Sequence, residues 1–170
     1  LTNKVAGSAF NVKIVAQDLN NNTVTSYGST VSITAAGSTL TGSPVTSGAF
    51  TSGVLSSQSL TLTTSGTGVT LSALGGGKSG TSGPFNVNAA ALDHFAIGAI
   101  STQTAGSAFN ITLTAQDVNN NTVTSFTGTV NLSTTAGTIS PATSSNFTGG
   151  TLTQSVTVTL AGSNRTISVL

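Results

Sequence analysis

The sequence predicts an all-β fold of two consecutive antiparallel β-sandwiches, and three observations lead to it. First, residues 5–34 read VAGSAFNVKIVAQDLNNNTVTSYGSTVSIT, and residues 104–133 read TAGSAFNITLTAQDVNNNTVTSFTGTVNLS. Second, the offset from Asp18 to Asp117 is about 100 residues, the size of a small domain rather than of a solenoid repeat. Third, Thr, Val and Ile are abundant, Gly punctuates them often, and no segment has a helical period.

Each copy of the repeat begins with a predicted strand. Apolar and polar residues alternate there, the period of a strand with one buried face. The apolar positions are Phe10, Val12, Ile14 and Ala16 in the first copy and Phe109, Ile111, Leu113 and Ala115 in the second. Runs of three Asn, residues 20–22 and 119–121, then predict a turn.

After the turn the chain is expected to return as a second strand. Its apolar positions are Val24, Tyr27, Val31 and Ile33, matched by Val123, Phe126, Val130 and Leu132. Two further strands follow in each copy, marked by Leu60 with Leu62, Val69 with Leu71, Val156 with Val158, and Ile167 with Val169.

The segment between the copies begins with a glycine-rich stretch, GGGKSGTSG. Phe85 and Val87 then predict a closing strand of the first sandwich, and Phe95 and Ile97 an opening strand of the second. We therefore expect domains at residues 1–90, without an opening strand, and 91–170, without a closing strand. The open edges are expected to be completed by flanking repeats of the same chain or by neighbouring copies.

The composition excludes several classes of function. Only 4% of the residues are charged, against roughly 25% in typical soluble proteins. Four scattered bases cannot neutralise a run of phosphates, which argues against nucleic-acid binding. No apolar run reaches the ~18 residues of a spanning helix, so no membrane insertion is expected. The chain has no Cys and hence no disulfide or thiolate chemistry.

With its motifs AGSAFN, AQD(L/V)NNNTVTS(Y/F) and the linker LDHFAI, the chain resembles bacterial immunoglobulin-like repeats. Such repeats occur in tandem in large secreted, surface-layer and adhesin-type proteins. The resemblance covers essentially the whole chain and implies immunoglobulin-like sandwiches at an extracellular or cell-surface location. Many members read D-x-x-G-N at the turn, whereas Asn21 and Asn120 stand here in place of Gly. Because Asn also accepts the left-handed conformation, the fold is not threatened.

The chain offers no convincing catalytic group. His94, the only histidine, follows Asp93, and neighbours on a strand point to opposite faces, so we expect no direct pair. No G-x-S-x-G motif surrounds any serine. The sequence from Gly77 to Ser79 is like the end of a phosphate-binding loop, but Ser72 occupies the position of the first required Gly. We therefore expect that the protein is not an enzyme.

Calcium is the one cofactor that the sequence suggests. Oxygen-bearing side chains stand at alternate positions of both turns, as hard cations require; they are Asp18, Asn20, Asn22, Asp117, Asn119 and Asn121. Asp93 could add a carboxylate. Each turn has only one carboxylate, however, and good sites gather several. Hydrogen bonding of the Asp side chain to its own turn is therefore the simpler expectation.

Asparagine glycosylation is a second candidate modification. The N-x-(S/T) motif occurs at Asn21, Asn110, Asn120, Asn131, Asn146 and Asn164. The motif marks acceptors only where the glycosylation machinery exists, and a chain this rich in Ser and Thr produces it by composition as well.

Two functions follow from the sequence. The first is a structural, non-catalytic repeat segment of an extracellular surface protein or fibre, such as a stalk, a surface layer or a filament subunit, which could assemble through open strand edges. The alternative is an adhesive module that recognises a surface or glycan, with calcium stabilising it. The absence of Trp disfavours sugar stacking.

Overall fold

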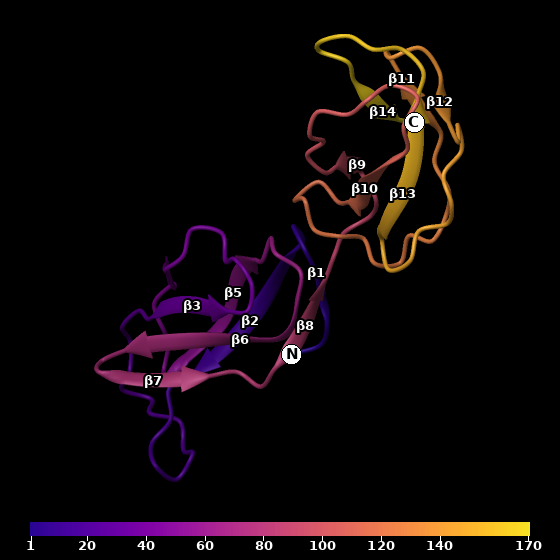
Figure 1. The fold of residues 1–170 in the computed structure, drawn as a ribbon. Coiled ribbons are helices and arrows are strands. Elements are labelled where there is room, and N and C mark those ends of the chain that lie inside the picture. The colour runs from indigo at the N-terminus through magenta and orange to yellow at the C-terminus, as the bar shows by residue number, and fades with distance from the viewer. The chain divides into compact units, whose positions relative to one another are not determined.

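The computed structural model describes residues 1–170, which form β-strands and no helix. The prediction of an all-β fold is confirmed. The strands form two compact units, Leu1–Ala90 (unit 1) and Ala91–Leu170 (unit 2) (Figure 1). No helix of the length and apolar character needed to cross a bilayer is present.

Unit 1 is a sandwich of two sheets. One sheet consists of β2 and β5, and the other has the order β1-β8-β6-β3-β4, with β7 also pairing with β6. All pairs are antiparallel except β1 with β8, which run parallel. The strands are β1 (Lys4–Val5), β2 (Ala9–Val15), β3 (Ser32–Ala36), β4 (Val45–Thr46), β5 (Val54–Thr61), β6 (Gly66–Gly75), β7 (Lys78–Thr81) and β8 (Phe85–Asn88).

Unit 2 is also a sandwich of two sheets, with orders β12-β13-β10-β9 and β11-β14. Its strands are β9 (His94–Ile97), β10 (Phe109–Gln116), β11 (Leu132–Thr134), β12 (Ile139–Ser140), β13 (Thr151–Val158) and β14 (Ile167–Val169). The predicted strands at Phe85 with Val87 and at Phe95 with Ile97 are thus present as β8 and β9.

The strand order of both units is immunoglobulin-like. In that fold, strands A, B, E and D form one sheet and C, F and G the other. Unit 2 has the complete A-B-E-D sheet as β9, β10, β13 and β12, facing β11 and β14 as C and F. Unit 1 has B and E as β2 and β5, facing C, F and G as β3, β6 and β8.

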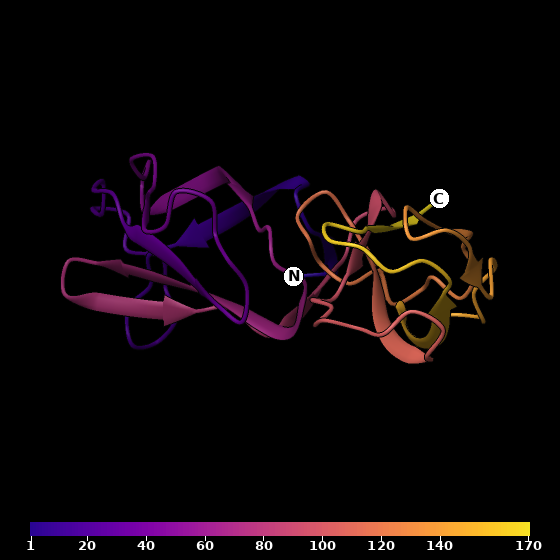
Figure 2. The same ribbon diagram turned by 45° about the horizontal axis from the view of Figure 1, so that its top comes forward.

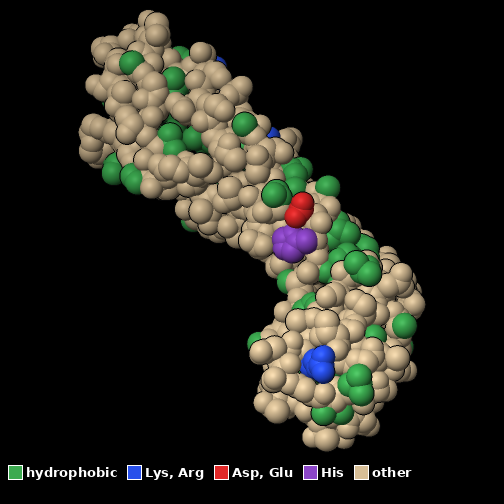
Figure 3. Space-filling view, turned by 90° about the horizontal axis from the view of Figure 1, so that it is seen from above, with side chains coloured by type: hydrophobic (Ala, Val, Ile, Leu, Met, Phe, Trp, Pro, Cys, Tyr) green, Lys and Arg blue, Asp and Glu red, His purple; other side chains and the backbone are tan.

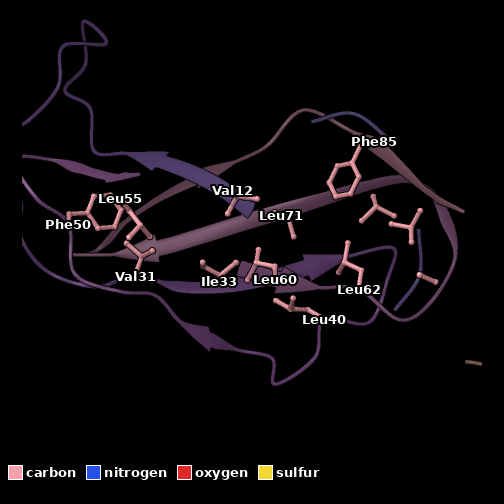
Figure 4. Close-up of a cluster of buried hydrophobic side chains, with 13 residues drawn as sticks. Val12, Val31, Ile33, Leu40, Phe50, Leu55, Leu60, Leu62, Leu71 and Phe85 are labelled. Carbon is pink, nitrogen blue, oxygen red and sulfur yellow. The ribbon is translucent and has the colours of Figure 1, made fainter. Parts of the chain in front are cut away.

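Each unit has its own hydrophobic core. In unit 1, Val12 and Leu60 from one sheet and Ile33 and Leu71 from the other belong to one cluster (Figure 4). Ile33 is 1% exposed and Val69 is 0% exposed, so the centre of this core is closed to solvent. In unit 2 the buried apolar side chains are Ile111, Leu113, Ala115, Val123, Val130, Leu132, Ala136, Ile139, Phe147, Val156 and Val158.

A β-bulge accounts for a one-residue length difference between the copies. In unit 1, Val12 faces Gln58 and Ile14 faces Leu55, so Ser56 and Ser57 together face a single residue of β2. In unit 2 the equivalent pairs are continuous, with Thr112 facing Thr153. Because the bulge absorbs the extra serine, the pairs on both sides keep the same register.

One sequence expectation about secondary structure was wrong. The return strand begins only at Ser32 in unit 1 and Leu132 in unit 2, because residues 23–31 first carry the chain from one sheet to the other. The glycine-rich stretch between the copies, in which no strand was predicted, contains strand β7. It forms the β6–β7 hairpin, whose turn residues Gly76 and Gly77 have φ of 57° and 71° (Figures 1 and 2). Two positive φ values are typical of a type I′ hairpin turn.

A glycine of positive φ closes the tight turn before strand E of each unit, β5 in unit 1 and β13 in unit 2. Gly53 has φ 77° and Gly150 has φ 75°. A Cβ atom on either glycine would overlap the carbonyl oxygen of Val24 or Val123. The glycine N–H donates to Tyr27 O in unit 1, which ties this turn to the crossing segment.

We predict that Gly53→Ala lowers the free energy of unfolding by about 2–4 kcal/mol, because the positive φ and the overlap with Val24 both oppose a side chain. Chemical denaturation measures the change. Gly80→Ala is the matched control, since no atom lies within 4 Å of its Cβ position and its φ is not positive. We expect a change within about 0.5 kcal/mol for the control; equal effects of the two substitutions would contradict the prediction.

Candidate functional site

The turn after β2 is organised around the carboxylate of Asp18. Its Oδ1 accepts hydrogen bonds from the main-chain N–H groups of Asn20 and Asn22, both at 2.9 Å. Its Oδ2 accepts from the side-chain Nδ2 of Asn22 at 3.0 Å. The main chain closes the same loop, with Asp18 N donating to Asn22 O at 2.9 Å. The structure thus shows the hydrogen-bonded turn that the sequence suggested as the simpler alternative to calcium.

Unit 2 repeats this turn. Asp117 Oδ1 accepts from the N–H groups of Asn119 and Asn121 at 2.9 and 2.8 Å, and Asn121 Nδ2 donates to Oδ2 at 2.9 Å. The residues that replace the usual Gly, Asn21 and Asn120, have φ of 65° and 63°. The prediction that Asn accepts the left-handed conformation here is confirmed.

The surroundings of the two turns differ. Asp117 is 0% exposed and Asn121 is 7% exposed, whereas Asp18 and Asn22 are exposed. The hydrogen bonds to Asn22, first from its side chain and then from its main chain, hold the pKa of the Asp18 carboxyl below its ordinary value of 3.8. These bonds favour the charged carboxylate, because only that form accepts all of them.

The calcium prediction stays a prediction. Asp18 and Asp117 belong to different units, and no group of three or more His, Asp, Glu or Cys side chains is gathered anywhere in the chain. In both turns N–H donors already occupy the carboxylate oxygens. A cation would have to turn the Asn22 or Asn121 amide so that its oxygen, not its nitrogen, faces the metal.

We predict that Asn22→Ala raises the pKa of Asp18 towards its ordinary value, because the largest stabilising hydrogen bond to the carboxylate is lost. An NMR pH titration of the side-chain carboxyl carbon measures the change. A folded-state pKa below the unfolded value means that the bonus in stability is present above about pH 4 and is lost as the pH falls through the folded-state pKa. An unchanged Asp18 titration in the variant would contradict this account.

We predict that the melting temperature of the protein is the same in EGTA and in millimolar calcium, because protein N–H groups already satisfy both carboxylates. Differential scanning calorimetry is the measurement. A clear rise with calcium would instead support the metal site, since a ligand that binds only the folded state stabilises it.

The expectation that Asp93 and His94 do not pair was wrong. The Nδ1 atom of His94 lies 2.9 Å from Oδ2 of Asp93. Strand alternation does not apply, because β9 begins at His94 and Asp93 precedes it. The Nε2 atom of His94 lies 3.2 Å from Oε1 of Gln116, so both ring nitrogens are engaged within the protein. Neither is placed to act as a base on a substrate.

The other sequence candidates lie apart from these turns. Lys78 opens strand β7, so the match to a phosphate-binding loop also lacks the helix that should follow it. All six candidate glycosylation residues are exposed. Asn21 and Asn120 lie in the aspartate turns, Asn110 in β10, and the others outside the strands. Their modification stays a prediction.

Sequence reasoning missed a groove in unit 1. It has a volume of about 710 Å³ and lies between β2 on one side and β6 with β7 on the other. Tyr27 and Phe50 form one part of the wall, with ring centroids 5.1 Å apart and an interplanar angle of 89°. Ile33 and Leu71 from the facing sheet line its floor. The only signal in the sequence was that no opening strand is predicted for the first domain, which leaves one edge of β2 without a neighbour.

No protein-family model and no curated protein matches the chain. Among solved structures it is similar to invasin, described as a bacterial integrin-binding protein, at 20% identity and a TM-score of 0.43. That match covers 96% of this chain and 33% of the invasin chain, so this chain spans about a third of it. It is also similar to the D0–D1 domain of intimin, at 17% identity and a TM-score of 0.34, covering 99% of this chain and 85% of that one. At these TM-scores the immunoglobulin-like assignment rests on the strand order.

Proposed function

We propose that the chain is a structural, non-catalytic segment of an extracellular or cell-surface protein or fibre, and that it carries tension. The observation that supports this most directly is the parallel pairing of β1 with β8, the first and last strands of unit 1. Lys4 faces Val87 and Val5 faces Asn88, and Ala6 N donates to Asn88 O at 2.8 Å.

Parallel terminal strands resist force in a particular way. When a chain is pulled along its length, the two strands are drawn in opposite directions along their common axis. Because the hydrogen bonds between them lie across that axis, they are loaded together rather than one after another. Unit 1 is therefore built to stay folded under tension, as a stalk or fibre segment requires.

The surface chemistry supports the same role. The chain has four Lys and Arg and three Asp residues. The face in Figure 3 shows only a few charged side chains among uncharged ones. Uncharged hydroxyl and amide groups therefore provide most of the hydrogen bonds between the surface and water. Because almost no surface group titrates, this solvation changes little with pH or salt. Few Lys and Arg also leave few sites for trypsin-like proteases.

We predict that Ala6→Pro lowers the force that unfolds unit 1, because proline removes the N–H that donates to Asn88 O. Single-molecule pulling of the whole chain by its two ends measures this, and unit 2 serves as an unchanged internal reference. Circular dichroism first establishes that the variant folds.

Val5→Pro is the matched control, one residue away on the same strand. The backbone N–H of Val5 alternates with that of Ala6 and points away from β8. We expect the control to unfold near the native force. If Ala6→Pro folds and unfolds at the native force too, the β1–β8 pair does not bear the load and the proposal loses its main support.

The groove in unit 1 favours a second candidate, an adhesive module that recognises a surface or glycan. Its half-buried Tyr27 could contact a ligand. A glycan array with the purified chain tests this, and specific binding would favour the adhesive function over the structural one.

A further inference from the structure

We propose that the groove along β2 is an acceptor site for an extended strand of the β9 type, supplied by a further repeat outside this chain. The strand would carry the pattern of Asp93–Ile97, with Phe as its anchor, and would run antiparallel to β2. The inference rests on the proposed function in one respect, namely that such units occur in series.

Unit 2 provides the template, because there the equivalent edge is occupied. Strand β9 pairs antiparallel with β10, with Ile97 facing Leu113, Phe95 facing Ala115 and His94 facing Gln116. The matching residues of β2 and its extension are Ile14, Ala16 and Gln17. Strand β2 pairs only with β5, so its other edge has no neighbouring strand.

The aromatic cluster of unit 1 lacks the ring that β9 supplies in unit 2. Phe95 lies 5.1 Å from Phe126 and 5.6 Å from Phe147 between ring centroids, and those two rings lie 5.0 Å apart. Tyr27 and Phe50 form the equivalent pair in unit 1, at 5.1 Å, and no third ring contacts them. Both residues line the groove, so the place of the missing ring is part of it.

The burial of equivalent residues also differs between the two units, as expected if unit 1 lacks this strand. Leu113 and Ala115 are both 0% exposed, whereas their counterparts Ile14 and Ala16 are only half-buried. The counterpart of the fully buried Asp117 is exposed. The sequences at these positions are nearly the same in the two units, so the difference follows from the presence or absence of the neighbouring strand.

A polar anchor is also in place. Gln116 donates through Nε2 to Asn120 O at 3.1 Å, which directs its Oε1 towards His94. Gln17 makes the same bond to Asn21 O at 3.0 Å. Its Oε1 is therefore set to meet a polar residue at the His94 position of an incoming strand.

A strand fits this site better than a compact ligand does. An open edge presents main-chain N–H and C=O groups at strand spacing, and an extended peptide satisfies them while its alternate side chains enter the groove. In unit 2 the neighbouring strand does this, with Asp93 N donating to Gln116 O and Gly98 N donating to Thr112 O, both at 2.8 Å. The equivalent carbonyls in unit 1 belong to Gln17 and Lys13.

The test uses the whole chain and a synthetic peptide of residues 91–100, ALDHFAIGAI. Isothermal titration calorimetry measures binding, and hydrogen exchange of backbone amides locates it. We expect saturable binding with new protection in residues 12–17. The matched peptide with Phe95→Ala should bind about tenfold more weakly or worse, because burial of the ring is lost.

Two variants of the chain complete the test. Ala73→Phe places a ring in the groove from β6 and should abolish binding, whereas Asn11→Phe adds a ring on the outward face of β2 and should not. If Ala73→Phe fails to fold, the two peptides still decide the question on the native chain.

Binding with protection at residues 12–17 supports the proposal. No binding, protection confined to residues 111–116, or self-association of the chain that buries the β2 edge would overturn it. The pulling experiment on Ala6→Pro does not depend on this groove. A negative peptide result beside a lowered unfolding force therefore removes the acceptor site and leaves the structural function standing.

Discussion

The hydrogen bonds between the Asp18 and Asp117 carboxylates and the Asn residues that follow fix where, in each unit, the chain leaves one sheet for the other. Once the turn is closed, Val24 N donates to Ala16 O and Tyr27 N donates to Val24 O. These bonds place Tyr27 against Phe50, and the carbonyl of Tyr27 then accepts from Gly53. The aromatic cluster and the glycine turn before β5 thus both depend on the position of one carboxylate.

The same local sequence has two different environments, and the neighbouring strand decides which. Asp117 is fully buried and Asp18 is exposed, although both accept nearly the same hydrogen bonds. At the opposite end of the strand order, unit 1 has the covering strand, β8, and unit 2 lacks it. Phe85 of β8 packs against Phe10 in unit 1, with ring centroids 6.3 Å apart, and Val69 beside it is fully buried. In unit 2, Phe109 and Ile167, the counterparts of Phe10 and Val69, are only half-buried and lie along a groove of about 410 Å³.

Much of this fold could be predicted from the sequence, because its long strands bury one face against a core. The alternation of apolar and polar residues at Phe109, Ile111 and Leu113 reflects that burial, and β10 lies where it was predicted. Strand β7 could not be found in this way, since its residues are all exposed and only the Gly76–Gly77 turn marks it. The turn hydrogen bonds were predictable because they are local. The groove and the pair of Asp93 with His94 were not, since one depends on the neighbouring strand and the other on where a strand begins.

The bulge at Ser56 and Ser57 has a consequence for how such sequences change over time. An added residue in a β-strand normally turns every later side chain to the opposite face. Here the pair Phe10 with Leu60 on one side of the bulge matches Phe109 with Val156, and the pair Ile14 with Leu55 on the other side matches Leu113 with Leu152. A gene that encodes repeats of this kind can therefore gain or lose one codon at this point without disturbing the core. The middle of β5 is a place where copies can diverge in length while they keep a common architecture.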